Sequence, residues 1–160
     1  MRDIDTACRE VAHAPIGPFA LADLIGLDVS LSAANSIYEA LGKPNRLKPS
    51  ELHQKLVQAG ALGRKTGRGF YVYRGRRIVS ENPKATEMLP TPQRNLSSQE
   101  IWLCLAQAIL QEAQLLIQDK ISDPQTINTA VKLGANFPNG PFDWNLADIK
   151  KTVPSIQAKT

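Results

Sequence analysis

The chain has little of the residue types that carry most metal, disulfide and acid–base chemistry. Among its 160 residues are two cysteines and two histidines. Cys8 and Cys104 fall in helical patterns without the dense spacing of a disulfide scaffold, and no group of histidine, cysteine and carboxylate residues has the spacing of metal ligands. Neither a metal site nor a disulfide-stabilised domain is predicted, and the cysteine usage favours a reducing, cytoplasmic setting.

Long apolar runs and secretion signals are missing as well. No apolar run approaches the ~18 residues that a membrane span needs, and residues 1–3 are not followed by the apolar stretch of a signal peptide. No Gly-x-Gly-x-x-Gly pattern follows a strand, so no dinucleotide-binding loop is predicted. The sequence therefore predicts a soluble, cytoplasmic protein without a membrane partner.

What the chain does have is apolar residues and a local excess of positive charge. Apolar residues make up 42% of the chain, enough for the core of one ordinary domain or two small ones. The formal net charge of +4 favours anionic partners. Six of the 19 basic residues gather in one short segment: Arg64, Lys65, Arg68, Arg74, Arg76 and Arg77. The same segment could equally be a solvated turn.

Apolar residues recur at helical spacing along most of the chain. The expected helices cover residues 4–11, 18–25, 29–41, about 51–59, 98–118 and 124–133. A capping box from Ser97 to Glu100 opens the longest of them, and Trp102 is predicted to lie in the core or in a contact between the two halves. Because no segment alternates as a strand would, the fold class is predicted to be all-α.

Some expectations are more local. The helix at 29–41 should turn one apolar stripe inward, made of Val29, Ala33, Ile37, Tyr38 and Leu41. Residues 70–73 are expected to be short and extended, and the proline-rich stretch 81–94 is expected to connect two halves without structure of its own.

An internal repeat relates the two halves. Residues 4–19 and 127–142 agree at 8 of 16 positions without a gap, and both copies end in Pro-x-Gly-Pro-Phe. In the first copy Gly17 and Pro18 predict a helix entry, and Gly26 its end. Repetition in one register predicts two related helical units.

The two copies are unequal in what surrounds them. A long helix precedes the second copy and nothing precedes the first, so the first unit is expected to lack its leading helix and residue 1 to be a cut rather than the start of the domain. The alternative is a native start with a helix lost in evolution. The predicted domains are 1–80, a linker at 81–97, and a shortened second unit at 98–160.

Two motifs carry a resemblance to a known family. The first runs from Pro15 to Asp28 as Pro-x-Gly-Pro-Phe-x-Leu-x-Asp-Leu-x-Gly-Leu-Asp, and the second from Leu62 to Tyr71 as Leu-Gly-Arg-Lys-Thr-Gly-x-Gly-Phe-Tyr. Together they resemble the C-terminal helical domain of the NAD-dependent 3-hydroxyacyl-CoA dehydrogenases, including bacterial members with a tandem pair. Residues 123–142 resemble the start of the same domain. The family usually has glycines ahead of the first proline, where this chain has Val11 to Ala14.

The resemblance implies a fold like the C-terminal helical domain of 6-phosphogluconate dehydrogenase. It implies a parent enzyme that oxidises (S)-3-hydroxyacyl-CoA to 3-oxoacyl-CoA with NAD in fatty-acid or aromatic-acid degradation. The family's NAD loop and its catalytic His–Glu pair belong to a separate N-terminal domain, so no catalytic and no cofactor-binding residue is expected here. The partners implied are that domain, the acyl-CoA, and a second copy in a homodimer or an intramolecular pseudo-dimer of the two units.

For the site, the resemblance implies four residues that line the acyl-CoA cleft: Pro15, Ile16, Gly17 and Phe19. Arg64 and Lys65 are candidate contacts for CoA phosphates. A Walker-type phosphate loop is rejected because only two residues separate Gly60 from Gly63, and Arg64 intervenes before the lysine. Both histidines are candidate acid–base groups. His53 is instead expected to be exposed in a helix, and His13, in a loop facing the cleft, is expected to be packed or solvated.

Two rival functions use other features. One is a free-standing assembly or regulatory module without catalysis. The other is a basic nucleic-acid binder, which rests only on the segment from Arg64 to Arg77 and would show steeply salt-dependent binding. Nucleic acid is not the expected partner.

Overall fold

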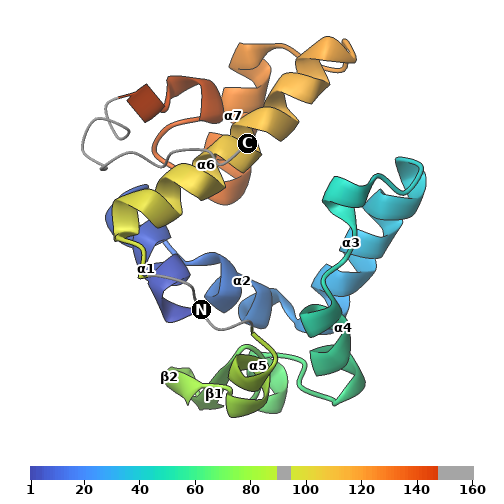
Figure 1. Ribbon diagram of the computed structural model, residues 1–160, viewed down its shortest axis with the longest axis vertical. Coiled ribbons are helices and arrows are strands. Elements are labelled where there is room, and N and C mark those ends of the chain that lie inside the picture. Colours follow the sequence, from blue (N-terminus) through green and yellow to red (C-terminus); the bar gives the residue numbers. More distant parts are fainter. Residues whose placement is uncertain (90–94, 148–160) are drawn as a thin grey trace. The chain divides into compact units, whose positions relative to one another are not determined.

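The structure is a computed structural model that describes residues 1–89 and 95–147 (Figure 1). Its helices are α1 (Arg2–Glu10), α2 (Pro18–Ile25), α3 (Leu27–Ala40), α4 (Glu51–Gln58), α5 (Pro83–Glu87), α6 (Ser98–Gln118) and α7 (Pro124–Ala135). Three short 3-10 turns are η1 (Asn45–Leu47), η2 (Arg64–Thr66) and η3 (Pro141–Asp143). One antiparallel hairpin joins β1 (Tyr71–Arg74) to β2 (Arg77–Glu81). The predicted all-α class is confirmed, and the hairpin is an addition to it.

Within the described residues the chain divides into two compact units. Residues 1–2 and 18–89 form the first, and residues 3–17 and 95–147 form the second. Helix α1 thus packs with the second unit, although the sequence repeat assigns it to the first copy. The compact units are defined by packing in the structure, whereas the predicted domains are defined by the sequence repeat. The domain boundaries therefore stay a prediction.

The first unit builds its core where α2, α3, α4 and α5 meet the hairpin (Figure 1). Leu27, Leu56, Tyr71 and Ala85 are almost wholly buried there. The extended segment at 70–73 is confirmed, but it pairs with β2, which was not foreseen. The stretch predicted to be a plain connector also contains the end of β2 and all of α5, which begins at a proline after Asn82 caps it.

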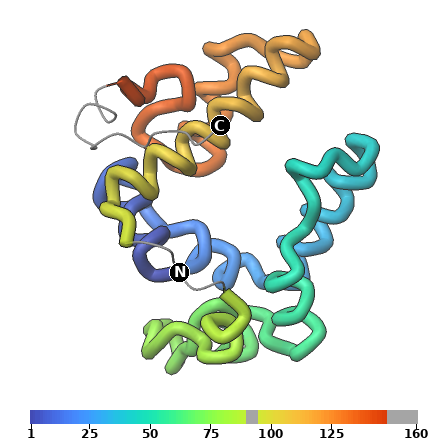
Figure 2. The backbone as a smooth tube through the Cα atoms, in the orientation of Figure 1, coloured from blue at the N-terminus to red at the C-terminus, as the bar shows by residue number. Residues whose placement is uncertain are grey.

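The core of the second unit is aromatic and centres on Trp102 of α6. Its indole lies 5.0 Å from the ring of Trp144, edge to face, and 6.2 Å from Phe137. Cys8 and Ala12 pack into the same cluster. The tube in Figure 2 shows α7 returning beside α6. Trp102 is therefore a core residue, which is the first of its two predicted roles.

Helix ends follow the capping signals with one exception. Ser97 Oγ accepts from the Glu100 N–H at 3.3 Å while the Glu100 carboxylate accepts from the Ser97 N–H at 2.8 Å, which completes the capping box. Asp123 caps α7 by accepting from Gln125 and Thr126, each at 3.0 Å. Gly134, expected to stop α7, is helical, and Asn136 ends the helix in the left-handed conformation with φ 54°.

The predicted inward stripe of α3 is wrong within this chain. Val29, Ile37 and Leu41 are 52%, 53% and 56% exposed, and α3 instead buries Leu27 and Leu31. Periodicity shows that a helix has an apolar face, but it does not show what covers that face. In α2, Leu24 and Ile25 are also half exposed.

One helix of the described chain, α6, has the length and composition of a membrane span. The sequence alone does not indicate this helix as a span, because its apolar residues do not form one continuous run. A core helix of a folded domain meets the same test, and α6 buries Trp102, Leu103, Ala106 and Ala113 inside the second unit.

The internal repeat is visible in the structure of the second unit. Gly17 packs on Asp5 so closely that a Cβ at position 17 would overlap the Asp5 side chain, and Gly140 packs on Asn128 in the same way. Both pairs stand 123 positions apart, the register of the sequence repeat. His13 and Asn136, also 123 apart, both take φ 54°.

We therefore predict that alanine at either repeated glycine is destabilising. Gly17→Ala and Gly140→Ala should each lower the free energy of unfolding by about 1–3 kcal/mol, because the added methyl group has no room. Gly134→Ala is the matched control, since a Cβ there meets nothing, and it should raise stability by about 0.5–1 kcal/mol. Urea unfolding of the three variants checks this, and a neutral Gly140→Ala would contradict the packing.

Candidate functional site

The two family-like motifs meet at a buried carboxylate. Asp23 of α2 is 1% exposed, and its oxygens accept from the backbone N–H groups of Phe70 at 2.8 Å and Tyr71 at 2.9 Å. The Tyr73 hydroxyl donates to the same carboxylate at 3.0 Å. A buried carboxylate is tolerated when several donors replace its water, so Asp23 fixes the start of β1 on α2.

The glycines of the second motif make room for Asp23. At Gly63 a Cβ would overlap the Asp23 backbone, and at Gly69 it would overlap the Asp23 carboxylate. Gly63 also has φ 93°, which an L side chain rarely adopts. The glycine-rich segment is therefore a cradle for a side chain of this protein, in line with the rejection of a phosphate loop.

Of the four predicted cleft residues, Phe19 lies in the first unit. Its ring meets Phe70 edge to face, with centroids 4.7 Å apart and an interplanar angle of 74°. It is half-buried and packs against the first core. Phe19 is thus packed against the core and remains partly exposed.

The other three cleft residues, Pro15, Ile16 and Gly17, lie in the second unit. Pro15 is exposed, Ile16 is half-buried and Gly17 is buried against Asp5. Because Phe19 and these three residues belong to different units, the lining of one common cleft stays a prediction.

The two predicted phosphate contacts differ in their surroundings. Lys65 donates to both carboxylate oxygens of Asp28, at 2.6 and 2.7 Å, and the hydrogen bond from Lys65 lowers the pKa of Asp28 below its ordinary value. Lys65 is therefore engaged, and Asp28 lies in the first turn of α3, whose N-cap residue is Gly26. Arg64 opens η2 and is half-buried.

His53 is not the exposed residue that the sequence pattern predicts. It is half-buried in α4, with Nε2 2.8 Å from the Leu27 carbonyl oxygen and 3.2 Å from Ser30 Oγ. A carbonyl oxygen only accepts, so Nε2 carries a proton and donates to it. His53 ties α4 to α3, and nothing in the sequence pattern signals this bond.

His13 is exposed and sits in the left-handed region, at a position where the resembled family usually has glycine. Among residues 1–89 and 95–147, no group of three histidine, cysteine or carboxylate side chains could hold a metal ion.

Comparison with known proteins agrees with the two motifs. The family described as 3-hydroxyacyl-CoA dehydrogenase, C-terminal domain, matches residues 1–73 and 104–148, which are the two stretches that hold the two copies of the repeat. A 3-hydroxybutyryl-CoA dehydrogenase of Bradyrhizobium diazoefficiens is 50% identical over 76 residues, 48% of this chain and 26% of that protein.

Longer matches reach across both units. A fatty acid oxidation complex subunit alpha of Vibrio vulnificus is 31% identical over 145 residues, 88% of this chain and 20% of that protein. The crystal structure of 3-hydroxybutyryl-CoA dehydrogenase from Escherichia coli matches with a TM-score of 0.72 and 25% identity, over 91% of this chain and 47% of that one. The chain thus spans about a quarter or less of the length of these two curated relatives, from Bradyrhizobium and Vibrio.

The Asp23 cluster gives a first prediction for this site. Asp23→Asn should lower the free energy of unfolding by about 3 kcal/mol or more, because an amide keeps one acceptor oxygen and places its NH2 group against one of the two N–H donors, Phe70 or Tyr71. Tyr73→Phe removes one neutral donor and should cost about 1 kcal/mol. Chemical unfolding measures both, and hydrogen exchange should accelerate at the Phe70 and Tyr71 amides in Asp23→Asn alone. Equal losses in the two variants would count against this role.

The Asp28–Lys65 pair predicts a pH-dependent contribution. Because its pKa is lowered in the folded chain, Asp28 contributes stability above its ordinary pKa of 3.8 and loses it as the pH falls through the lowered value. The stability difference between wild type and Lys65→Met should therefore be present at neutral pH and vanish in acid. Lys55→Met, an exposed change in α4, should show no such step between about pH 5 and about pH 2 in urea unfolding.

Proposed function

Because the chain belongs to the 3-hydroxyacyl-CoA dehydrogenase family through that family's C-terminal domain, we propose that it is the helical, substrate-cleft and assembly part of a cytoplasmic dehydrogenase. The whole enzyme would oxidise (S)-3-hydroxyacyl-CoA to 3-oxoacyl-CoA with NAD in fatty-acid or aromatic-acid degradation. The observation that carries the proposal is the Asp23 cradle, in which both family motifs meet in one unit.

The described residues do not fit the dinucleotide itself. Their strands form one antiparallel hairpin, whereas a dinucleotide site needs a parallel strand that leads through a glycine-rich loop into a helix. Two glycines of the loop, Gly63 and Gly69, lie directly against Asp23, which leaves no room for a phosphate there. We therefore assign NAD binding and the proton and hydride steps to a separate domain of the parent enzyme.

What this chain contributes is binding and positioning of the acyl-CoA. Pro15, Ile16, Gly17 and Phe19 are proposed to line the acyl part of the cleft, with Phe19 held by its contact with Phe70. Arg64 and Lys65 are proposed to attract CoA phosphates, with Arg64 the more available because Lys65 is paired with Asp28.

The exposed apolar residues of α2 and α3 support the assembly role. Leu24, Ile25, Val29, Ile37 and Leu41 are each half or more exposed, and large apolar patches of this kind mark protein–protein contacts. We propose that they pack against the dinucleotide-binding domain or a second copy, in a homodimer or a pseudo-dimer of the two units. The same observation favours the second candidate, a free-standing assembly module without catalysis.

The test uses acyl-CoA binding and turnover by the 160-residue chain. The chain alone should bind acetoacetyl-CoA in calorimetry and should release no NADH from 3-hydroxybutyryl-CoA and NAD. Phe19→Ala should weaken acetoacetyl-CoA binding by about tenfold, since a large apolar contact surface is lost. Phe142→Ala, the equivalent change in the second copy, is the control and should leave the affinity within about twofold.

Two kinds of outcome would contradict the proposal. NADH formation by the isolated chain would place catalytic residues within it. Equal binding of acetoacetyl-CoA by wild type and Phe19→Ala would remove Phe19 from the cleft, and absence of any CoA-ester binding would favour the free-standing assembly module.

A further inference from the structure

The β1–β2 hairpin carries positive charge that the fold does not use. Residues 52–80 contain seven basic residues and no acidic one. Five of the seven, namely Arg64, Arg68, Arg74, Arg76 and Arg77, have no ion pair with a carboxylate in residues 1–89 and 95–147. The nearby carboxylates are engaged, because Asp28 holds Lys65, and Glu81 accepts from the Arg2 N–H at 2.7 Å.

The strand register places three arginines on one face. Tyr73 is paired with Ile78, and both pack toward the core of the first unit. Side chains alternate between the two faces of a strand, so the next pair, Arg74 opposite Arg77, points away from that core. An isolated bridge sets Arg68 opposite Val72, two residues from Arg74 and hence on the same outward face.

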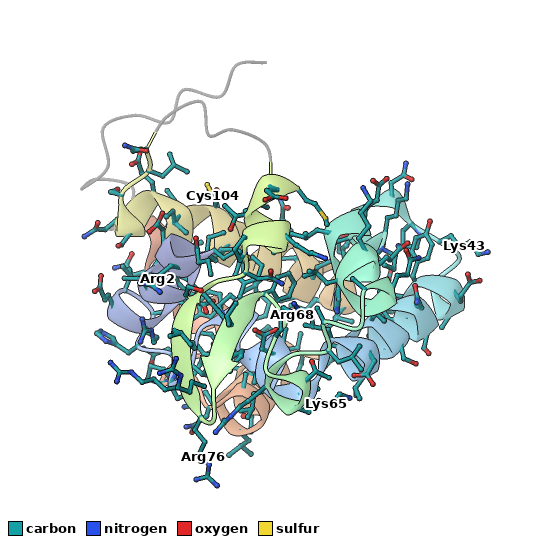
Figure 3. All side chains as sticks on the ribbon, turned by 90° about the horizontal axis from the view of Figure 1, so that it is seen from below. Arg2, Lys43, Lys65, Arg68, Arg76 and Cys104 are labelled. Carbon is teal, nitrogen blue, oxygen red and sulfur yellow. The ribbon has the colours of Figure 1, made fainter. Side chains whose placement is uncertain are left out.

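The fourth arginine sits in the turn. Gly75 takes φ 61°, which lets two residues link the strands, and Arg76 follows it. Figure 3 shows the Arg76 side chain at the tip of the hairpin, extended away from the ribbon. All four arginines of this hairpin surface, Arg68, Arg74, Arg76 and Arg77, are exposed.

Like charges opposite each other weaken a strand pair, so the Arg74–Arg77 pair costs stability unless an anion lies between the two side chains. Guanidinium groups bind phosphate through two parallel hydrogen bonds each, which distinguishes arginine from lysine as a phosphate contact. Three arginines at one short turn, with Arg68 farther along the same face, suit an anion with more than one phosphate group. Such a ligand is the nucleotide end of coenzyme A, with its pyrophosphate and its 3′-phosphate.

We propose that this hairpin surface binds the phosphate groups of the coenzyme A nucleotide. The inference rests on the proposed function for the identity of the ligand and extends it from η2 to the hairpin. The same chemistry would also hold free pyrophosphate, so the experiment separates the two sources.

The test is titration calorimetry on the whole 160-residue chain. Wild type should bind CoA, should bind 3′-dephospho-CoA more weakly, and should give no heat with pantetheine, which lacks the nucleotide phosphates. The variant R74Q/R76Q/R77Q should bind CoA about tenfold or more weakly, because several charge-assisted hydrogen bonds are lost. The control K48Q/K55Q/K84Q removes the same charge from other exposed positions and should stay within about twofold of wild type.

A second variant separates recognition from simple attraction. R74K/R76K/R77K keeps the charge and loses the planar fork, so it should recover only part of the affinity. Circular dichroism of each variant checks that the chain remains folded. Because the substituted positions are exposed, we expect the fold to be unchanged.

Three results would overturn the inference. One is that R74Q/R76Q/R77Q binds CoA as tightly as wild type does. If Phe19→Ala still weakened acetoacetyl-CoA binding, the proposed function would stand, and only the role of the hairpin surface would be lost. Another is that pyrophosphate binds as tightly as CoA, which would make the hairpin a general anion surface. The third is that the chain prefers a single-stranded oligonucleotide over CoA, with the preference lost in R74Q/R76Q/R77Q.

Discussion

A single buried carboxylate organises the first unit. Asp23 is buried, and its carboxyl oxygens accept from the Phe70 and Tyr71 N–H groups and from the Tyr73 hydroxyl. A buried polar group is stable only if its donors stay where they are, so α2, the glycine cradle and the hairpin are fixed together. The two motifs occur as a pair because Asp23 of the first makes this contact with Phe70 and Tyr71 of the second.

The second copy has an apolar residue where the first has that carboxylate. In the register of the repeat, position 146 corresponds to Asp23 and holds leucine, which packs against the aromatic core of the second unit. The proline turn and the glycine contact persist, with Asn128 accepting from the Phe142 N–H at 3.0 Å. After this turn the second copy forms the 3-10 turn η3 in the place where the first copy has α2.

The sequence predicts those parts of the fold that depend on local chemistry. The capping box at Ser97, the Asp123 cap and the repeat are visible because each uses residues close in the chain. The hairpin is missed because Tyr71 to Tyr73 is continuously apolar and a bulge shifts the register after Val72, so no alternation remains to be seen. The His53 bond to the Leu27 carbonyl and the exposure of Val29 depend on which elements meet in space. For the site, the motifs single out Phe19, which is a half-buried aromatic residue, while the hairpin arginines appear in the sequence only as a charge cluster.

The two faces of the hairpin have separate constraints, and this bears on how the arginine surface could arise. The inward face, with Tyr71, Tyr73 and Ile78, carries the apolar burial and the bond to Asp23 that hold the strands together. The outward face contributes repulsion through Arg74 and Arg77, which the inward face must offset. Because the stabilising contacts of the hairpin lie on its inward face, the side chains of the outward face can be selected for binding a ligand. A bound anion would offset this repulsion by accepting hydrogen bonds from the arginines, which explains why the positive charge is present on the outward face.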